Sequence, residues 1–462
     1  KDADAKKNAD AIMKLETALA NASLTNVDKR DPHNLAHHEK LSELTLNAPD
    51  FAWPKYLVAA GAPGLDFFNV TEPKFLTEFN KQLKATDLAT WKAYLRWHLV
   101  HNRAGDLSSP FDNEHFAFFK KYLRGVTEQP ARWKRCVGHV DNELGEALGQ
   151  AFVARTFGPD VKARTVDMTA RIEKAMEQDL TTLAWMSEPT RKQALEKLHH
   201  IVNKIGYPDH WRDYTDVVVD AKDFAGDVER ATMFEWDRQL KKIGKPVDRS
   251  EWGMTPPTVN AYFNPQMNDI NFPAGVLQPP LFDAKLDDAP NYGNTGSTVG
   301  HELTHGFDDE GRQFDEKGNL RDWWTAKDAD AFKERAQCVI DQYGSYTVVD
   351  DIKINSKLTL GEDVADLGGT VLAYAAWHDL TKTERLKKID GFTPEQRFFI
   401  GLGQWACSNE RPENERLHAL TNPHSPARYR INGVVSDMPE FAAAFSCKAG
   451  SPMVSKKPCR VW

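Results

Sequence analysis

The sequence lacks several features that would place it in a membrane, disordered or nucleic-acid-binding class. No apolar run approaches the roughly 20 residues of a membrane helix, and there is no repeat period or low-complexity tract. Basic residues (59) do not outnumber acidic ones (67), so the net charge of −8 gives no reason to expect nucleic acid as a partner. The 462 residues, 41% of them hydrophobic and including 13 Trp and 24 Phe, exclude disorder and suffice for a large core.

Cysteine is scarce, and its number is odd. None of the five forms a C-x-x-C pair, which argues against a zinc knuckle or a thioredoxin-like motif: Cys136, Cys338, Cys407, Cys447 and Cys459. Two explanations stay open at this point, namely five buried thiols in a reducing compartment or a disulfide-bonded secreted protein with partners missing. Residues 1–10 contain neither an initiator Met nor the apolar segment of a secretory signal. We therefore expect the numbering to begin inside a longer protein.

Hydrophobic periodicity predicts a mainly α protein with a small β element. Helical spacing predicts helices over 7–20, 145–157, 189–204 and 220–243. Ser187 is the expected cap of the third helix, and Gly206-Tyr207-Pro208 its expected end. Short extended stretches at 258–263 and 269–272 predict a hairpin. Further helices are expected from about residue 295 and over 325–343, 361–378 and 394–406.

An H-E-x-x-H motif follows the predicted hairpin. On a helix, His301 and His305 lie one turn apart on one face, so both imidazoles can bind one zinc, and Glu302 can accept a proton from a zinc-bound water. Three apolar residues recur every four positions on the opposite side: Val299, Leu303 and Phe307. The helix can bury that side while the histidines face a cleft. The alternative is two unremarkable surface histidines beside a solvated glutamate.

A catalytic zinc needs a third protein ligand, and a second predicted helix offers one. Glu362 and Asp366 are four residues apart on one face, which Gly369 continues. We interpret Glu362 as the third zinc ligand and Asp366 as an acceptor for the other N–H of a ligand histidine. Gly369 would permit close approach of the zinc helix. The alternative is an acidic first helical turn, which the helix dipole favours.

Several longer motifs around these residues share one resemblance. They stand as Asn260-Ala261-Tyr262-Phe263, 271–280 (NFPAGVLQPP), 301–309 (HELTHGFDD), Trp323-Trp324, 361–366 (GEDVAD), Pro439-Glu440-Phe441 and 459–462 (CRVW). In this order they resemble the neprilysin and endothelin-converting-enzyme family of zinc metallopeptidases. The resemblance is dense from about residue 250 to the end and weaker before it. It implies a thermolysin-like zinc peptidase catalytic domain, with parts of a helical outer domain.

The resemblance also implies a role for each matching residue. His301, His305 and Glu362 match the zinc ligands, Glu302 the general base and Asp366 the residue that orients a ligand histidine. Four further positions match groups that contact substrate or the tetrahedral intermediate: Asn260, Ala261, His424 and Arg430. Without the resemblance, His424 and Arg430 would be interpreted as ordinary loop and surface groups.

In some places the chain departs from the family pattern. Leu281 stands where a Phe is common, and Ser297-Thr298 where bulkier apolar residues precede the zinc helix. The family is also longer. The resemblance therefore implies that this chain is the C-terminal two-thirds of an exported protein. It pairs Cys338 with Cys459, and it implies that the other three cysteines bond to residues outside this sequence: Cys136, Cys407 and Cys447.

These observations together predict a zinc-dependent endopeptidase that cleaves oligopeptides on the amino side of hydrophobic residues. We expect one Zn²⁺ per chain, no nucleic-acid partner, no membrane span within the chain, and a location that is secreted, periplasmic or on the extracellular face. Residues 1–103 are expected to lead into the outer domain, and 104–462 to form the catalytic domain with the zinc site in 246–462. The alternatives are a catalytically silent peptide-binding relative and a helical scaffold of a reducing compartment.

Overall fold

The computed structural model describes residues 2–384 and 387–462, which divide into two compact units. Unit 1 comprises Lys1–Gln129 and Thr215–Val247, and unit 2 comprises Pro130–Tyr214 and Asp248–Trp462. The expected division into 1–103 and 104–462 differs from this one, because unit 1 is assembled from two separate segments of the chain. The expected division separates an outer domain from a catalytic domain, and it stays a prediction.

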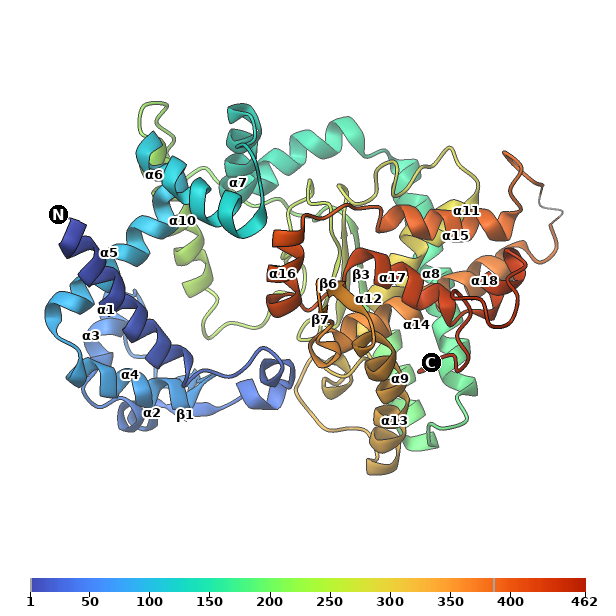
Figure 1. Cartoon of the computed structure of the whole chain (residues 1–462), viewed down its shortest axis with the longest axis horizontal. Coiled ribbons are helices and arrows are strands. Elements are labelled where there is room, and N and C mark those ends of the chain that lie inside the picture. The colour runs from blue at the N-terminus through green and yellow to red at the C-terminus, as the bar shows by residue number, and fades with distance from the viewer. Residues whose placement is uncertain (1, 385–386) are drawn as a thin grey trace. The chain divides into compact units, whose positions relative to one another are not determined.

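Unit 1 consists of helices and one two-stranded ribbon (Figure 1). In the ribbon, β1 pairs with β2 antiparallel. The helices and strands are α1 (Asp2–Ala20), β1 (His38–Lys40), α2 (Leu41–Asn47), α3 (Trp53–Ala59), β2 (Phe67–Asn69), α4 (Pro73–Ala85), α5 (Leu88–Arg103), α6 (Ser109–His115) and α10 (Phe224–Leu240).

Unit 2 contains the long helices of the second half of the chain and two small sheets among the described residues. Its elements up to the H-E-x-x-H helix are α7 (Arg132–Thr156), α8 (Pro159–Thr182), α9 (Glu188–His199), β3 (Val202–Gly206), β4 (Tyr262–Asn264), β5 (Asp269–Pro273), α11 (Asp288–Asn291) and α12 (Ser297–His305). The elements after it are α13 (Ala326–Gly344), β6 (Thr347–Val349), β7 (Ile352–Lys353), α14 (Ser356–Thr381), α15 (Pro394–Trp405), α16 (Pro412–Thr421), α17 (Ala427–Ser436) and α18 (Pro439–Ala444).

The predicted hairpin is confirmed, and it belongs to a three-stranded sheet. β4 pairs with β5 antiparallel, with Phe263 opposite Ile270. β5 is central, because β3 pairs with its other edge in parallel, from Val202 opposite Asp269 to Gly206 opposite Pro273. Thus β4 is an edge strand, whose free side can accept another extended chain.

The prediction of one helix over 189–204 is wrong at its C-terminal end. Helix α9 ends at His199, and 202–206 form β3. The strand exists because β5, more than sixty residues later in the chain, supplies its backbone partners, and local periodicity cannot report such a pairing. Ser187 is at the N-cap position, but its hydroxyl donates to Asp328 on α13 rather than capping the helix.

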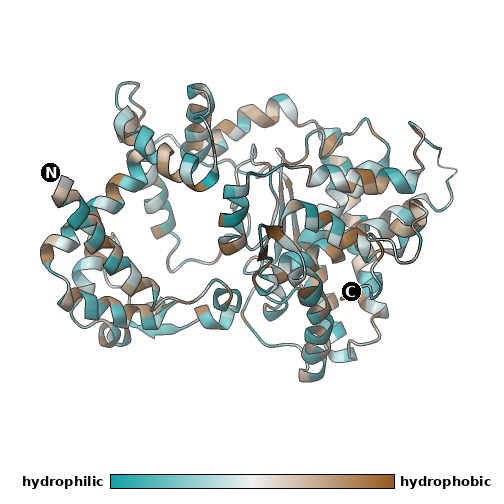
Figure 2. Cartoon of the chain, viewed as in Figure 1, coloured by the Kyte–Doolittle hydropathy of each residue, from teal (hydrophilic) through white to brown (hydrophobic). Residues whose placement is uncertain are grey.

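The main apolar core lies in unit 2 and includes side chains of α12 and α14. Hydrophobic residues recur along the helices of both units (Figure 2), but the large cluster of buried apolar side chains runs from Phe157 to Trp462 and contains no residue of unit 1. No helix among the described residues is both long enough and apolar enough to cross a membrane.

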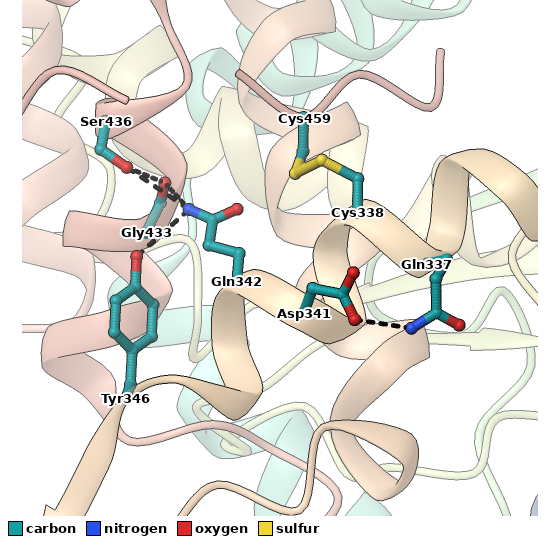
Figure 3. Close-up of a disulfide and its surroundings, with 8 residues drawn as sticks. All are labelled: Gln337, Cys338, Asp341, Gln342, Tyr346, Gly433, Ser436 and Cys459. Carbon is teal, nitrogen blue, oxygen red and sulfur yellow. Dashed lines mark hydrogen bonds between the residues drawn. A yellow bond between two sulfur atoms is a disulfide. The ribbon is translucent and has the colours of Figure 1, made fainter. Parts of the chain in front are cut away.

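A disulfide bond joins Cys338 on α13 to Cys459 near the C-terminus, which confirms the pairing that the resemblance implied (Figure 3). The remaining three cysteines are free in the described residues: Cys136, Cys407 and Cys447. That they bond to residues outside this sequence stays a prediction.

Candidate metal centre

Helix α12 is amphipathic in the way that its sequence predicts. Val299 and Leu303 of the helix, and Phe307 just after its end, are fully buried in the core of unit 2. His301 and His305 lie on the other side and line a cavity of about 530 Å³. Packing of the apolar side therefore fixes the helix, and with it the direction of both imidazoles.

Two glycines let α12 and α14 approach each other backbone to backbone. A Cβ atom on Gly369 would lie 2.2 Å from the backbone nitrogen of His301, and one on Gly300 would lie 2.4 Å from the carbonyl oxygen of Gly369. Both distances are too short for any side chain, and the atoms met are backbone atoms that cannot rotate away. The close approach predicted for Gly369 is confirmed, and it carries the acidic face of α14 to the two histidines.

Helix α14 begins at Ser356, so its acidic residues are not in its first turn. Glu362 and Asp366 lie in the second and third turns, where the N-terminal helix dipole has little effect. Asp366 is buried, with 7% of its surface exposed. The alternative that these two carboxylates merely form an acidic first turn, favoured by the helix dipole, is therefore wrong. Their position is explained by the residues that they contact.

His301, His305 and Glu362 converge on one point. His301 Nε2 lies 2.9 Å from His305 Nε2. Glu362 Oε2 lies 3.3 Å from His301 Nε2, and Glu362 Oε1 lies 3.7 Å from His305 Nε2. Two imidazoles from α12 and a carboxylate from α14, with 8–18% of each side chain exposed, are a donor set that zinc prefers.

A carboxylate contacts the Nδ1 atom of each imidazole, the ring nitrogen that points away from the convergence point. His301 Nδ1 lies 2.8 Å from Asp366 Oδ1, and His305 Nδ1 lies 2.7 Å from Asp308 Oδ2. An ionised carboxylate only accepts hydrogen bonds, so each Nδ1 carries the proton and each Nε2 presents a lone pair. Two such nitrogens 2.9 Å apart repel unless a proton or a metal ion is shared between them. The residues therefore fit a zinc ion.

The electrostatics of the pocket favour positive charge at this point. Burial by itself lowers the pKa of His301, but Asp366 and Glu362 raise it to about 10. Burial raises the pKa of Glu362, but His305 and His301 hold it well below its usual value, so the carboxylate is ionised. A cation would satisfy the same field without protonating either ring.

Glu302 lies beside the convergence point. It is 5% exposed, and its carboxylate lies within 4.8 Å of the ligand atoms of both histidines. Distance alone would therefore allow Glu302 as a ligand. Glu362 is the better assignment because its two oxygens reach both Nε2 atoms. Burial raises the pKa of Glu302, which suits a group that must accept and return a proton.

Arg430 on α17 makes a two-pronged contact with Asp366. Its Nε and Nη2 lie 2.6 and 2.7 Å from the two carboxylate oxygens, and Nη2 also lies 3.3 Å from Glu362 Oε2. Such a bidentate pair fixes the Asp366 carboxylate against His301. The guanidinium also lies 4.4 Å from the ring centre of Trp405. The structure thus gives Arg430 a contact with the metal-site carboxylates that the sequence did not predict.

Helix α17 is itself held by α13. Figure 3 shows Gln342 of α13 donating from Nε2 to the carbonyl of Gly433, at 3.1 Å, and to Ser436 Oγ, at 3.4 Å. Tyr346 stacks on Tyr429 with ring centres 4.4 Å apart. These contacts and the nearby disulfide explain how a segment 64 residues beyond Asp366 is positioned beside it.

The remaining predicted residues line the same cavity. His424 Nε2 lies 3.2 Å from Glu362 Oε2, and burial lowers the pKa of the His424 imidazole. Asn260 and Ala261 directly precede edge strand β4 and also line the cavity. The structure therefore brings together every site residue that the sequence predicted, while their individual roles stay predictions.

Sequence reasoning missed Asp308. Its Oδ2 contacts His305 Nδ1, and its Oδ1 accepts hydrogen bonds from the backbone N–H groups of Glu310, at 3.0 Å, and Gly311, at 2.7 Å. The available signal was an acidic residue three positions after the second histidine, just past the end of the helix. Asp308 does for His305 what Asp366 does for His301.

A helix with two histidines one turn apart, completed by a glutamate from a second helix, defines a thermolysin-like metal centre. Two family models, both described as peptidase family M13, match residues 260–461 and 1–208. The chain belongs to peptidase family M13. Its residues 1–208 thus match part of the family's N-terminal region.

Named relatives and solved structures agree with this assignment. Endothelin-converting enzyme 1 of Homo sapiens is 37% identical over 98% of this chain and 60% of that protein, and Neprilysin-3 of Drosophila melanogaster is 33% identical over 100% and 61%. The chain thus spans about three-fifths of the length of these relatives. The crystal structure of the zinc metalloprotease ZMP1 of Mycobacterium tuberculosis in complex with an inhibitor superposes with a TM-score of 0.96, at 37% identity, over 100% of this chain and 71% of that one.

Proposed function

We propose that this chain is a zinc-dependent endopeptidase that hydrolyses oligopeptides. The observation that carries the proposal is the pair of imidazole Nε2 atoms 2.9 Å apart, each with its Nδ1 against a carboxylate. Glu362 supplies a third ligand at the same point. Membership of peptidase family M13 supports the same reaction class.

Zinc, when bound, makes a water molecule acidic enough to act as a nucleophile near neutral pH. Glu302 accepts the proton of that water and later delivers it to the leaving amine. His424, whose Nε2 lies beside Glu362, donates a hydrogen bond to the oxyanion of the tetrahedral intermediate. Asn260, Ala261 and Arg430 hold the peptide backbone, the first two where edge strand β4 begins.

The cleavage preference rests on the apolar part of the cavity wall. Leu281, Val276 and Phe263 line it together with Thr298. We infer that hydrophobic side chains are accepted on the leaving-group side, so that cleavage falls on their amino side. Leu281 and Thr298 leave more room than the bulkier residues typical of the family.

An exported location follows from the same proposal. The disulfide between Cys338 and Cys459 supports this location, because structural disulfides are rare outside oxidising compartments.

The test is hydrolysis of an internally quenched peptide library by the purified chain, with the products identified by mass spectrometry. We expect cleavage that a chelator abolishes and that stoichiometric Zn²⁺ restores. Binding of peptides without hydrolysis, in protein that retains one zinc, would favour a silent peptide-binding relative. Protein that binds no zinc would overturn the proposal itself.

A further inference from the structure

Lys197 is a buried lysine in contact with the segment that follows helix α12. It lies on α9, two residues before the end of that helix, and is 1% exposed. Its Nζ donates to the carbonyl oxygens of Gly311, at 2.7 Å, and Phe314, at 2.8 Å. The same nitrogen lies 5.5 and 5.7 Å from the ring centres of Phe307 and Phe263. Burying an amine away from water costs free energy unless it is hydrogen-bonded. We therefore asked what these hydrogen bonds of Lys197 do.

Both protonation states of this amine can make these contacts. Burial lowers the pKa of Lys197 to about 7, although Asp308, Asp315 and Glu316 partly oppose that shift. An ammonium has three N–H donors and a neutral amine has two. Two carbonyl oxygens can therefore be held whether or not the group is charged.

One of those carbonyls belongs to the residue that holds Asp308. The backbone N–H of Gly311 donates to Asp308 Oδ1 at 2.7 Å. A Cβ on Gly311 would lie 1.8 Å from the carbonyl oxygen of His305, so this peptide is packed directly against the end of α12. A continuous series of contacts thus runs from Lys197 through Gly311 and Asp308 to His305.

We propose that Lys197 is a positioning residue for the zinc site, which it serves by fixing the Gly311–Phe314 segment so that Asp308 stays aligned with His305. The proposal rests on the proposed zinc function, and it adds a residue from a helix that contributes no ligand. Without the two hydrogen bonds, the segment gains freedom and Asp308 spends less time against His305. The imidazole is then less well oriented, and zinc binds more weakly.

The first test is Lys197→Met, which keeps an apolar stem of similar length and removes the donors. We expect its zinc dissociation constant, measured by competition with a chromophoric chelator, to rise about tenfold, at the lower end of the range for outer partners of metal ligands. The Co²⁺-substituted protein should show a changed visible absorption spectrum, which a merely destabilised but correctly ordered site would not show. Circular dichroism at the assay temperature confirms that the fold is intact.

Lys204→Met is the matched control. Lys204 is also buried, at 8% exposure, and its Nζ pairs with Asp269 at 2.6 Å and donates to the carbonyl of Glu251 at 2.7 Å. Its loss leaves the buried Asp269 carboxylate without its charged partner, so the melting temperature should fall at least as much as in Lys197→Met. Zinc affinity should be unchanged, because these contacts do not lead to Asp308.

A double-mutant cycle with Asp308→Ala tests the route. If Lys197 acts through Asp308, Lys197→Met should cause little further loss of zinc affinity once Asp308 is absent. Additive losses, an unchanged dissociation constant in folded Lys197→Met, or an equal loss in Lys204→Met would overturn the proposal. If Lys197→Met does not fold, Lys197→Gln takes its place with the same expected loss of zinc affinity, because its shorter stem draws the N–H donors back from the two carbonyl oxygens. Wild-type protein that binds no zinc would instead refute the proposed function.

Discussion

The two units of this protein bury their apolar side chains to very different extents. In unit 2, Val299 and Leu303 of α12 and Val364 of α14 are completely buried within one continuous core. In unit 1, Trp97 and Phe118 are 44% and 49% exposed and line an apolar cavity of about 900 Å³. The metal centre is thus built on the unit whose packing is continuous.

This difference indicates how the side chains of the metal centre are held in place. Ligands must be held to within about half an ångström to bind a metal well, and dense packing of the elements that carry them supplies that order. The helices of unit 1, with large side chains still exposed, have fewer such constraints. Four predictions test whether the chemistry and the stability of the site depend on the packing of unit 2.

The largest effect should come from Glu302→Gln, which separates chemistry from packing. The side chain keeps its size in the buried site, so the fold and bound zinc should persist. Peptide turnover should fall by about 10²–10⁴-fold because the general base is lost. Metal analysis and kcat on a quenched peptide are the measurements, and near-normal turnover would remove Glu302 from its proposed role.

The next effect should come from Gly369→Ala, which breaks the packing of α12 on α14. The new Cβ would meet backbone atoms of His301 and Gly300, so we expect a loss of about 1–3 kcal/mol or more in the free energy of unfolding, together with weaker zinc binding. Gly105→Ala in unit 1 is the control, because nothing lies within 4 Å of its Cβ position. That variant should change stability by less than about 0.5 kcal/mol. Equal effects of the two variants would refute the contrast between the units.

Asp366→Ala should have a smaller effect, which we expect mainly on zinc affinity. It removes the acceptor at His301 Nδ1 and the bidentate partner of Arg430, but no metal ligand. We expect zinc affinity to fall roughly 10–100-fold. Titration with a competing chelator measures this, and Asp28→Ala in unit 1 serves as a control in which affinity should not change. An unchanged affinity in Asp366→Ala would make that carboxylate a structural group only.

The smallest effect concerns pH. The pKa of Lys197 is about 7 in the folded protein against 10.5 ordinarily, so between these values the unfolded chain binds more protons. Stability should therefore rise with pH across this window, by at most about 1.4 kcal/mol per pH unit from this group. The gain should be absent in Lys197→Met. Urea unfolding of both proteins from pH 7.5 to 9.5 measures the difference, and parallel pH profiles would contradict it.

Local sequence patterns predicted the helices that carry the site better than the contacts between distant parts of the chain. The H-E-x-x-H spacing and the apolar residues at 299, 303 and 307 were sufficient to predict α12 and its orientation. The start of α14 was misplaced by about five residues, which made Glu362 seem to lie in a first turn. Strand β3 was missed because its partner is distant in the chain.

The sequence alone predicted a mainly α zinc-peptidase fold, the histidine pair, Glu362 as a candidate third ligand and, through the family resemblance, the pairing of Cys338 with Cys459. These depend on spacing along the chain or on long motifs, which a sequence records directly. The folded structure was needed to show that Asp308 contacts His305 and that Lys197 holds the carbonyl of Gly311. It also decided that Arg430 contacts Asp366. The contacts of Lys197 and Arg430 join residues 64 or more positions apart, and nothing local fixes such distances before the chain packs.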